Sequence, residues 1–387
     1  MRRLLYSLLV LLAVTLLIFG GYYLRTRYFA SPTDQSANLP AQDLPALPVE
    51  PAAFTPSGLP DTSAAAGRLS AEPAVAFFIG GDHALLIRQD GQVIRSINGQ
   101  EENLSRVGVA DLAEASFSFD GKYIVAGFGE KLARHYSIFD VAAKTWRPLP
   151  AEIVSPVWAP KDNRLAYYSP GEKPAVVSLD ISNEKAAPVV LARLAVQAAA
   201  LSWPNSGWLI VNEEPSAFQP GSLWALDLKT GTSRVLAEDY YAADGIWDEN
   251  FSRGLLFWGS RANRGGRLVL VNNRGEFEKQ LAILTLPGKC VFRSASASST
   301  AAAAELFCAV PRDQRALEIS PLPDAYYQQS LFTTDDVLRI SLSNGAVVSV
   351  YDDPRATFDA VQPVLRAGRF YFINRLDGLV YWLSLGE

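Results

Sequence analysis

The stretch from Ala115 to Leu149 decides the fold; it opens with ASFSFDGKYIVAGFG and closes with YSIFDVAAKTWRPL. Short apolar runs alternate here with turn residues, and Asp120-Gly121 has the composition of a tight hairpin turn. Related copies recur roughly every 40 residues, a period typical of repeat folds. They span Ala74–Leu104, Ser155–Leu191, Ala200–Leu236 and Gly245–Leu281. Four short antiparallel strands per unit of this length predict the blade of an all-β propeller.

The number of blades follows from the length of the repeat region. Ala74 to Glu387 holds 314 residues, and at about 45 residues per blade this predicts seven blades. The sixth unit, Lys289–Tyr351, carries an insertion, and the seventh has three apolar runs before the chain ends. Because a closed ring leaves few exposed strand edges, we expect Arg68–Ser70 to supply the missing outer strand. A β-solenoid or a sandwich explains a four-strand repeat less well.

Several turns resemble those of a known family. FSFDGK at Phe117–Lys122 and VWAPKD at Val157–Asp162 resemble the opening turns of TolB-like, WD-repeat-like bacterial propeller blades. LDLKTG at Leu226–Gly231 is similar to a later turn of those blades, whereas Phe119 replaces their usual proline. The sixth unit, with KCVF, ELFCAVP and DDVLRISLSNG, resembles uncharacterised membrane-anchored propellers of bacteria with reduced genomes. The resemblance implies architecture and location but no activity.

Residues 4–24 form an uncharged run, LLYSLLVLLAVTLLIFGGYYL. At about 1.5 Å per residue it spans about 31 Å, which matches a bilayer core of about 30 Å. We therefore expect residues 1–29 to be a single-pass membrane anchor. Arg2, Arg3 and the α-amino group outweigh Arg25 and Arg27 slightly, which favours a cytoplasmic N-terminus and an extracytoplasmic propeller. The alternative is a cleaved signal peptide, whose apolar run is shorter and ends in a small-residue cleavage site.

Residues 30–73 contain eight prolines among alanine, serine and aspartate. Proline disrupts regular helices and sheets, so this composition predicts a disordered, semi-extended linker between the anchor and a propeller at 74–387. The alternative is that this proline-rich segment itself serves as a ligand.

The composition excludes several functions. A net charge of −5 argues against nucleic-acid binding, which needs basic surfaces. Two cysteines and two histidines, His83 and His135, are too few and too scattered for a zinc site. Asp335-Asp336 and Asp352-Asp353 have the character of turn or strand-end residues. We therefore predict no catalytic, cofactor-binding or metal-binding residues, and no enzyme.

Cys290 and Cys308 lie on the first and second predicted strands of the sixth unit. Neighbouring antiparallel strands bring facing residues close enough for a disulfide, and oxidising compartments permit one. We predict a Cys290–Cys308 bond, with two buried free thiols as the alternative.

The insertion, Pro311–Ser330, is the one long departure from the repeat. Long loops on a rigid scaffold often carry function, and Asp324, Tyr326 and Tyr327 suit a contact with a protein or a glycan. The alternative is an insertion that merely packs on the rim. The sequence thus predicts a non-catalytic binding or scaffolding module for an envelope protein or glycan partner. A divergent hydrolase of glycans or peptides, with its site on the propeller axis, is the second hypothesis.

Overall fold

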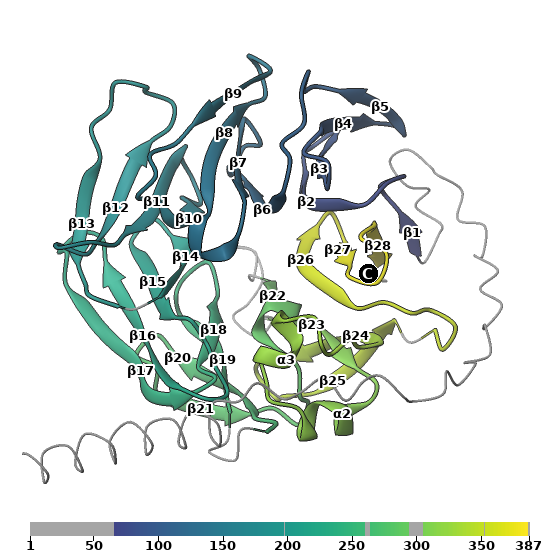
Figure 1. Ribbon diagram of the computed structural model, residues 1–387. Helices are drawn as coiled ribbons and strands as arrows, with labels where there is room; N and C mark the ends of the chain where they lie inside the picture. Colours follow the sequence, from purple (N-terminus) through teal and green to yellow (C-terminus); the bar gives the residue numbers. More distant parts are fainter. Residues whose placement is uncertain (1–65, 197, 260–263, 294–304, 352, 386–387) are drawn as a thin grey trace, which may run out of the picture. The chain divides into compact units, whose positions relative to one another are not determined.

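In the computed structural model, the described part of the chain forms seven four-stranded antiparallel sheets, which confirm the predicted all-β, seven-bladed propeller (Figure 1). The structure describes residues 66–196, 198–259, 264–293, 305–351 and 353–385. The predicted membrane segment at 4–24 and the linker as far as residue 65 lie outside the described residues. Within the described ranges, no helix has the length and apolar character needed to span a bilayer.

In blades 1 to 6 the strands follow one another in chain order, with the first strand nearest the ring centre (Figure 1). Blade 7 takes its outer strand from the N-terminal side of the propeller. Blades 1 and 2 consist of β2 (Ala74–Ile79), β3 (Ala84–Arg88), β4 (Val93–Ile97), β5 (Gln100–Asn103), β6 (Leu112–Phe117), β7 (Tyr123–Phe128), β8 (His135–Asp140) and β9 (Thr145–Pro148). Blades 3 and 4 consist of β10 (Val154–Trp158), β11 (Arg164–Ser169), β12 (Ala175–Asp180), β13 (Val189–Arg193), β14 (Ala199–Asn205), β15 (Trp208–Glu213), β16 (Pro220–Asp227) and β17 (Ser233–Tyr241). Blades 5 and 6 consist of β18 (Asp244–Trp247), β19 (Arg253–Trp258), β20 (Arg267–Asn272), β21 (Phe277–Gln280), β22 (Cys290–Arg293), β23 (Glu305–Pro311), β24 (Asp335–Ser341) and β25 (Val347–Tyr351). Blade 7 consists of β26 (Ala360–Arg366), β27 (Arg369–Asn374), β28 (Val380–Ser384) and β1 (Ala66–Arg68).

The hydrophobic core is divided among the contacts between blades. Seven clusters of buried side chains each join two successive blades, and one of them joins blade 7 back to blade 1. That closing cluster packs Phe77 and Leu86 of blade 1 against Tyr371 and Trp382 of blade 7. Because both faces of a blade are covered, the middle strands are apolar at nearly every position, whereas the outer strand β5 is fully exposed.

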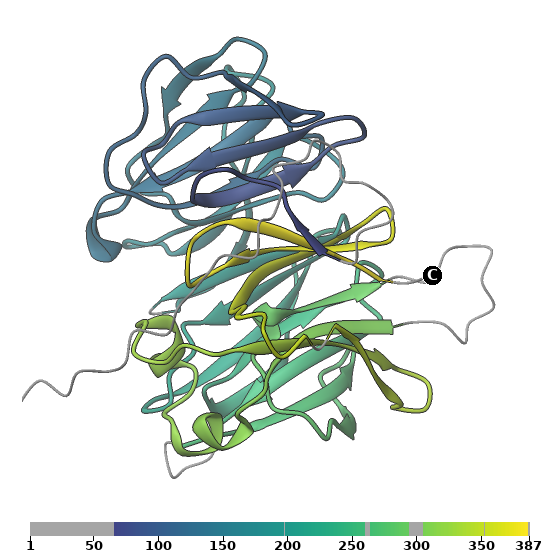
Figure 2. The same cartoon turned by 90° about the vertical axis from the view of Figure 1, so that its right-hand side faces the viewer.

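The N-terminal strand closes the ring. β1 pairs antiparallel with β28, with Ala66 opposite Leu383 and Arg68 opposite Tyr381. Figure 2 shows β1, in purple, beside the yellow strands of blade 7. A strand from before Ala74 was expected to complete this blade; it begins at Ala66 rather than at Arg68. The propeller therefore includes the last part of the range expected to be linker.

The predicted hairpin turns occur where glycine is needed. Gly121 has φ 70°, in the left-handed region that glycine adopts without strain. The Asp120 carboxylate accepts a hydrogen bond from the backbone N–H of Lys122 at 3.1 Å, which fixes this turn.

The insertion is the connection between β23 and β24 in blade 6. It contains two short helices, α2 (Gln314–Ile319) and α3 (Asp324–Tyr327). Helical periodicity is absent from this part of the sequence because six and four residues are too few to show it.

Candidate binding site

The insertion lies at the end of the propeller where first strands begin and second strands end, which we call the insertion face. Blade 6 enters this face through the 3₁₀ turn Pro287–Lys289, directly before β22. The backbone N–H of Leu284 donates to the Gln314 side chain at 2.8 Å, and that of Gly265 donates to the Ser320 carbonyl at 2.9 Å. The insertion is therefore attached to the surfaces of blades 5 and 6 by its own polar groups.

A buried ionic cluster holds the insertion against blade 7. Lys289 is only 2% exposed, and its Nζ lies 2.7 Å from Asp359 Oδ1 and 2.8 Å from Asp335 Oδ2. Tyr326 Oη lies 3.0 Å from the same Nζ and donates to Asp359 at 2.6 Å. Arg375 forms an ion pair with Asp359 at 3.1 Å. Two positive and two negative side chains balance one another, as buried charges must.

The pKa values of the two carboxyl groups in this cluster, Asp335 and Asp359, are shifted in opposite directions. Burial raises the pKa of Asp335 in spite of Lys289. Burial would also raise the pKa of Asp359, but Lys289 and the hydrogen bonds from Tyr326 and Thr333 hold it below its usual value. Asp359 receives more donors than Asp335, so its charged form is the better stabilised.

Tyr326 is buried, whereas a residue that contacts a partner must lie on the surface. It is 3% exposed and belongs to the core cluster between blades 5 and 6. The Arg375 guanidinium covers its ring at 3.8 Å and donates to its carbonyl at 2.7 Å. The expectation that Tyr326 contacts a partner is therefore corrected: this ring anchors the insertion.

Asp324 and Tyr327 lie on another side of α3 and connect the insertion to blades 4 and 5. Asp324 accepts hydrogen bonds from the Ala217 backbone at 2.5 Å and from the Ser216 hydroxyl at 3.2 Å. Tyr327 is 51% exposed, and its hydroxyl donates to Asp244 at 2.7 Å. Burial raises the pKa of Asp244, and the Tyr327 hydrogen bond partly offsets this. Tyr327 therefore combines a fixed position with an accessible ring.

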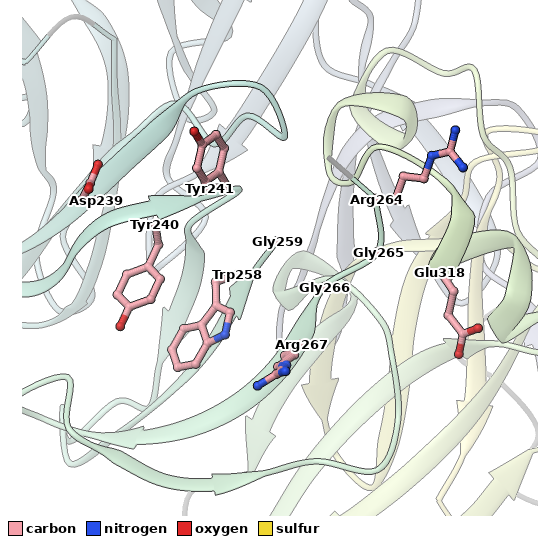
Figure 3. A pocket seen from close by; sticks show the side chains of 10 residues that line it. All are labelled: Asp239, Tyr240, Tyr241, Trp258, Gly259, Arg264, Gly265, Gly266, Arg267 and Glu318. Atoms are coloured by element: carbon pink, nitrogen blue, oxygen red, sulfur yellow. The ribbon is translucent and has the colours of Figure 1, made fainter. Parts of the chain in front are cut away.

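A cavity of about 520 Å³ opens between the end of β17, residues 259 and 264–266 from the connection between β19 and β20, and helix α2. Figure 3 shows Tyr240 and Trp258 side by side on one wall, with Arg264 and Glu318 coming from the other side. The two rings stack with centroids 4.9 Å apart and planes 15° apart. Arg267 lies opposite Trp258 in the β19–β20 ladder.

A second chamber of about 330 Å³ continues from this cavity along β17. It shares Tyr240 and Trp258 with the first; Val235 of blade 4 and Phe277 of blade 5 add apolar surface, and Glu238 adds a carboxylate. Two contacts between the blades mark its surroundings: Arg234 donates to the Asn273 carbonyl at 2.6 Å, and Gly259 donates to the Tyr241 carbonyl at 2.7 Å. We call the two chambers together the blade 4–5 groove.

The predicted disulfide is present. Cys290 on β22 faces Cys308 on β23, and their sulfurs are bonded with Cα atoms 4.1 Å apart. Both residues lie in the core cluster between blades 5 and 6. Cys290 directly follows Lys289 in the sequence. The bond therefore fixes the base of blade 6 beside the insertion.

The other acidic and histidine candidates have structural partners. Asp335 belongs to the Lys289 cluster, Asp336 pairs with Arg312 at 2.7 Å, and Asp353 accepts from Arg355. His83 contacts the adjacent Asp82 at 2.8 Å. Asp352 lies outside the described residues.

The sequence did not reveal the blade 4–5 groove. Trp258 is only partly buried and lines both chambers. The sequence directly after Trp258, GSRANRGGR at 259–267, could have indicated this site, because its three arginines interrupt an otherwise regular blade.

No protein-family model matches the sequence, and no curated protein does either. Solved structures do match. A YCF48 protein bound to a D1 peptide is 11% identical, with a TM-score of 0.52, over 86% of this chain and 96% of that one. The propeller domain of Cps50 (Swd1) from Myceliophteria thermophila is 13% identical, with a TM-score of 0.50, over 82% and 99%.

A prolyl endopeptidase is 14% identical, with a TM-score of 0.50, over 78% of this chain and 46% of that one. This chain therefore spans about half the length of the endopeptidase. At such low identity these likenesses show the fold alone, and the chain is a seven-bladed β-propeller.

Proposed function

We propose that this chain is a membrane-anchored, extracytoplasmic propeller that binds a protein or glycan partner of the cell envelope on its insertion face, without catalysis. The observation that carries the proposal is the insertion itself. A buried ionic cluster fixes it to blade 7, hydrogen bonds fix it to blades 4 and 5, and Tyr327 remains half exposed above Asp244. A preorganised surface loses little freedom on binding, which favours affinity.

Exposed apolar side chains around α3 support a binding role. Phe218 follows the Ala217 contact to Asp324, and Phe332 stacks with Arg375 at 4.5 Å on the other side of the helix. Both are about half exposed, as is Leu376 next to Arg375. Aromatic side chains and arginine are enriched at the centres of protein interfaces. The YCF48 propeller, which has the same fold, is bound to a peptide, so such a fold accommodates a polypeptide ligand.

The location rests on two features of the chain. The apolar run at 4–24, flanked by arginines, has the length of a bilayer span. The Cys290–Cys308 disulfide suits an oxidising compartment, which lies outside the cytoplasm.

Site-specific photocrosslinking tests the proposal in cells that make the full chain. The crosslinker p-benzoylphenylalanine replaces Tyr327 in one variant and Phe218 in another. A third variant carries it at Phe119, which is exposed in the turn between β6 and β7 at the opposite end of the blade. We expect a discrete adduct at Tyr327 or Phe218 after irradiation and none at Phe119.

Adducts that are equally abundant at Phe119, or absent at both insertion positions, would refute binding on the insertion face. The crosslinked partner is then purified and incubated with the wild-type chain. Cleavage of that partner would refute the non-catalytic part of the proposal and support the hydrolase hypothesis.

A further inference from the structure

The turn between β18 and β19 carries a short pattern that the binding function does not use. Asn250, Phe251 and Ser252 match Asn-x-Ser/Thr, with a residue other than proline in the middle. This tripeptide is the acceptor for N-linked glycans in exported proteins, where it lies on surface loops. A tripeptide is too short to identify an acceptor by itself, so its place in the fold is what matters.

The turn is held firmly, and it presents the polar groups of the pattern outward. The Phe251 ring is 2% exposed and stacks with Trp208 at 4.9 Å between centroids, while its backbone has φ 52°, in the left-handed region. The Asp248 carboxylate accepts hydrogen bonds from the backbone N–H of Ser252 at 2.6 Å and from its hydroxyl at 2.5 Å. Phe251 is therefore buried, whereas Asn250 and Ser252 on either side of it are exposed.

The Asn250 side chain plays no part in holding this turn. Asparagine in a turn usually accepts a hydrogen bond from the backbone N–H two residues further on. Four other turn asparagines of this chain do so: Asn183, Asn205, Asn272 and Asn344. Asp248 performs that role here, and the Asn250 amide makes no hydrogen bond to any residue that the structure describes. The amide nitrogen can therefore carry a substituent without the loss of a contact in the folded chain.

The second copy of the pattern, Asn103-Leu104-Ser105, differs in each of these respects. Asn103 ends the outer strand β5; its amide nitrogen donates to the Gln92 side chain at 2.7 Å, and its oxygen accepts from the Ser105 backbone N–H at 3.0 Å. Ser105 is only 6% exposed, and its hydroxyl accepts from the Val93 N–H at 3.0 Å. Both polar groups of this copy are engaged, so it serves as an internal control.

We propose that Asn250 is the acceptor of an N-linked glycan, which a membrane glycosyltransferase transfers from a polyprenyl diphosphate carrier. The Asn250 Nδ2 atom forms a bond to the anomeric carbon of the glycan, and the bond from that carbon to the diphosphate oxygen breaks. Polyprenyl diphosphate leaves with the bonding electrons, and the amide nitrogen gives up one proton to a base of the transferase. The pattern requires the Ser252 hydroxyl beside the amide.

The position of the turn is compatible with the proposed function. The connection between β18 and β19 lies at the end of the propeller opposite the insertion face, so a glycan there leaves Tyr327 and Phe218 uncovered. The inference goes beyond the proposed function, because it uses the extracytoplasmic location but is independent of partner binding.

Glycopeptide mapping of the full chain, purified from membranes of the cells that naturally make it, tests the proposal. Trypsin releases Asn250 in the peptide 235–253 and Asn103 in the peptide 96–106. We expect the first peptide to carry an added mass that yields sugar fragment ions and is attached to Asn250. The second peptide should have its unmodified mass.

Variants of the full chain made in the same cells identify the acceptor atom. Asn250→Gln and Ser252→Ala should each abolish the added mass, whereas Ser252→Thr, which keeps a hydroxyl, should retain it. Asn103→Gln should leave the added mass unchanged. Thermal unfolding checks that each variant folds, and Asn250→Gln, which breaks no contact, decides the matter if Ser252→Ala does not fold.

An unmodified peptide 235–253 from the natural cells would overturn the inference, as would equal modification of the peptide 96–106. Added mass that persists in Asn250→Gln would place the sugar on another atom and would overturn it as well. None of these results changes the Tyr327 and Phe218 crosslinks, so failure here is distinguishable from failure of the proposed function.

Discussion

Replacing Lys289 with Met tests whether the buried ionic cluster holds the insertion in place. The Nζ lies within 3.0 Å of Asp335, Asp359 and Tyr326, and both carboxylates are at most 1% exposed. Met keeps the length of the side chain but leaves two buried carboxylates with Arg375 as the one remaining positive charge. Removing one partner of a buried ion pair costs about 3–5 kcal/mol, so we expect a loss of this size in the free energy of unfolding at pH 7.

The loss should shrink as the pH falls. Without Lys289, the folded-state pKa values of Asp335 and Asp359 rise, so the folded variant takes up a proton at a pH where the unfolded chain does not. Stability of the variant therefore increases relative to wild type between pH 7 and pH 5. Urea unfolding followed by tryptophan fluorescence at both pH values measures this. Lys161→Met, at an exposed turn of blade 3, is the matched control. An unchanged midpoint for Lys289→Met, or a loss that grows on acidification, would refute the reasoning.

Three further predictions concern the disulfide, the insertion and the topology. Replacing Cys290 and Cys308 together with Ala should lower the free energy of unfolding by about 3 kcal/mol; denaturant titration measures it, and a change under 1 kcal/mol would contradict the prediction. Tyr326→Ala should destabilise by about 3–5 kcal/mol as a core truncation does, whereas Tyr327→Ala should cost about 1 kcal/mol for its single hydrogen bond; equal losses would show that both rings are anchors. Protease treatment of intact cells should digest the propeller but not residues before Leu4, and a protected propeller would reverse the proposed orientation.

The fold could be predicted because its signals are local. The Asp120-Gly121 turn and the apolar runs beside it depend on neighbours a few residues away, and each blade repeats them. The closing strand was harder to place. The segment Ala66–Arg68 is short and only partly buried. It forms a strand because it pairs with β28, which lies far away in the sequence. Register of this kind is not encoded within the segment itself.

The site was predicted only in part for a related reason. Tyr326 and Tyr327 are adjacent, and a polar loop would expose both rings, but the short helix α3 turns one into the core and the other to the surface. Lys289, in LPGKC, has the sequence of a solvated turn, and its burial depends on Asp335 and Asp359 from later strands. Side chains that meet only in the folded ring have no signature in a single stretch of sequence.

The closure of blade 7 has a consequence for how the chain folds as it is made. β1 is synthesised before any other strand of the propeller, and β28 is synthesised last. The Ser70 hydroxyl, for example, accepts from the Val380 N–H across 310 positions. Contacts this distant in sequence slow folding, because a large loop must close before they form. Ring closure therefore has to wait until β28 has emerged, and until then the edge of β1 and the face of blade 1 that packs against blade 7 are unprotected. A nascent or partly exported chain would need a chaperone over that interval, and a truncation that removes only β28 would leave both ends of the ring exposed to aggregation.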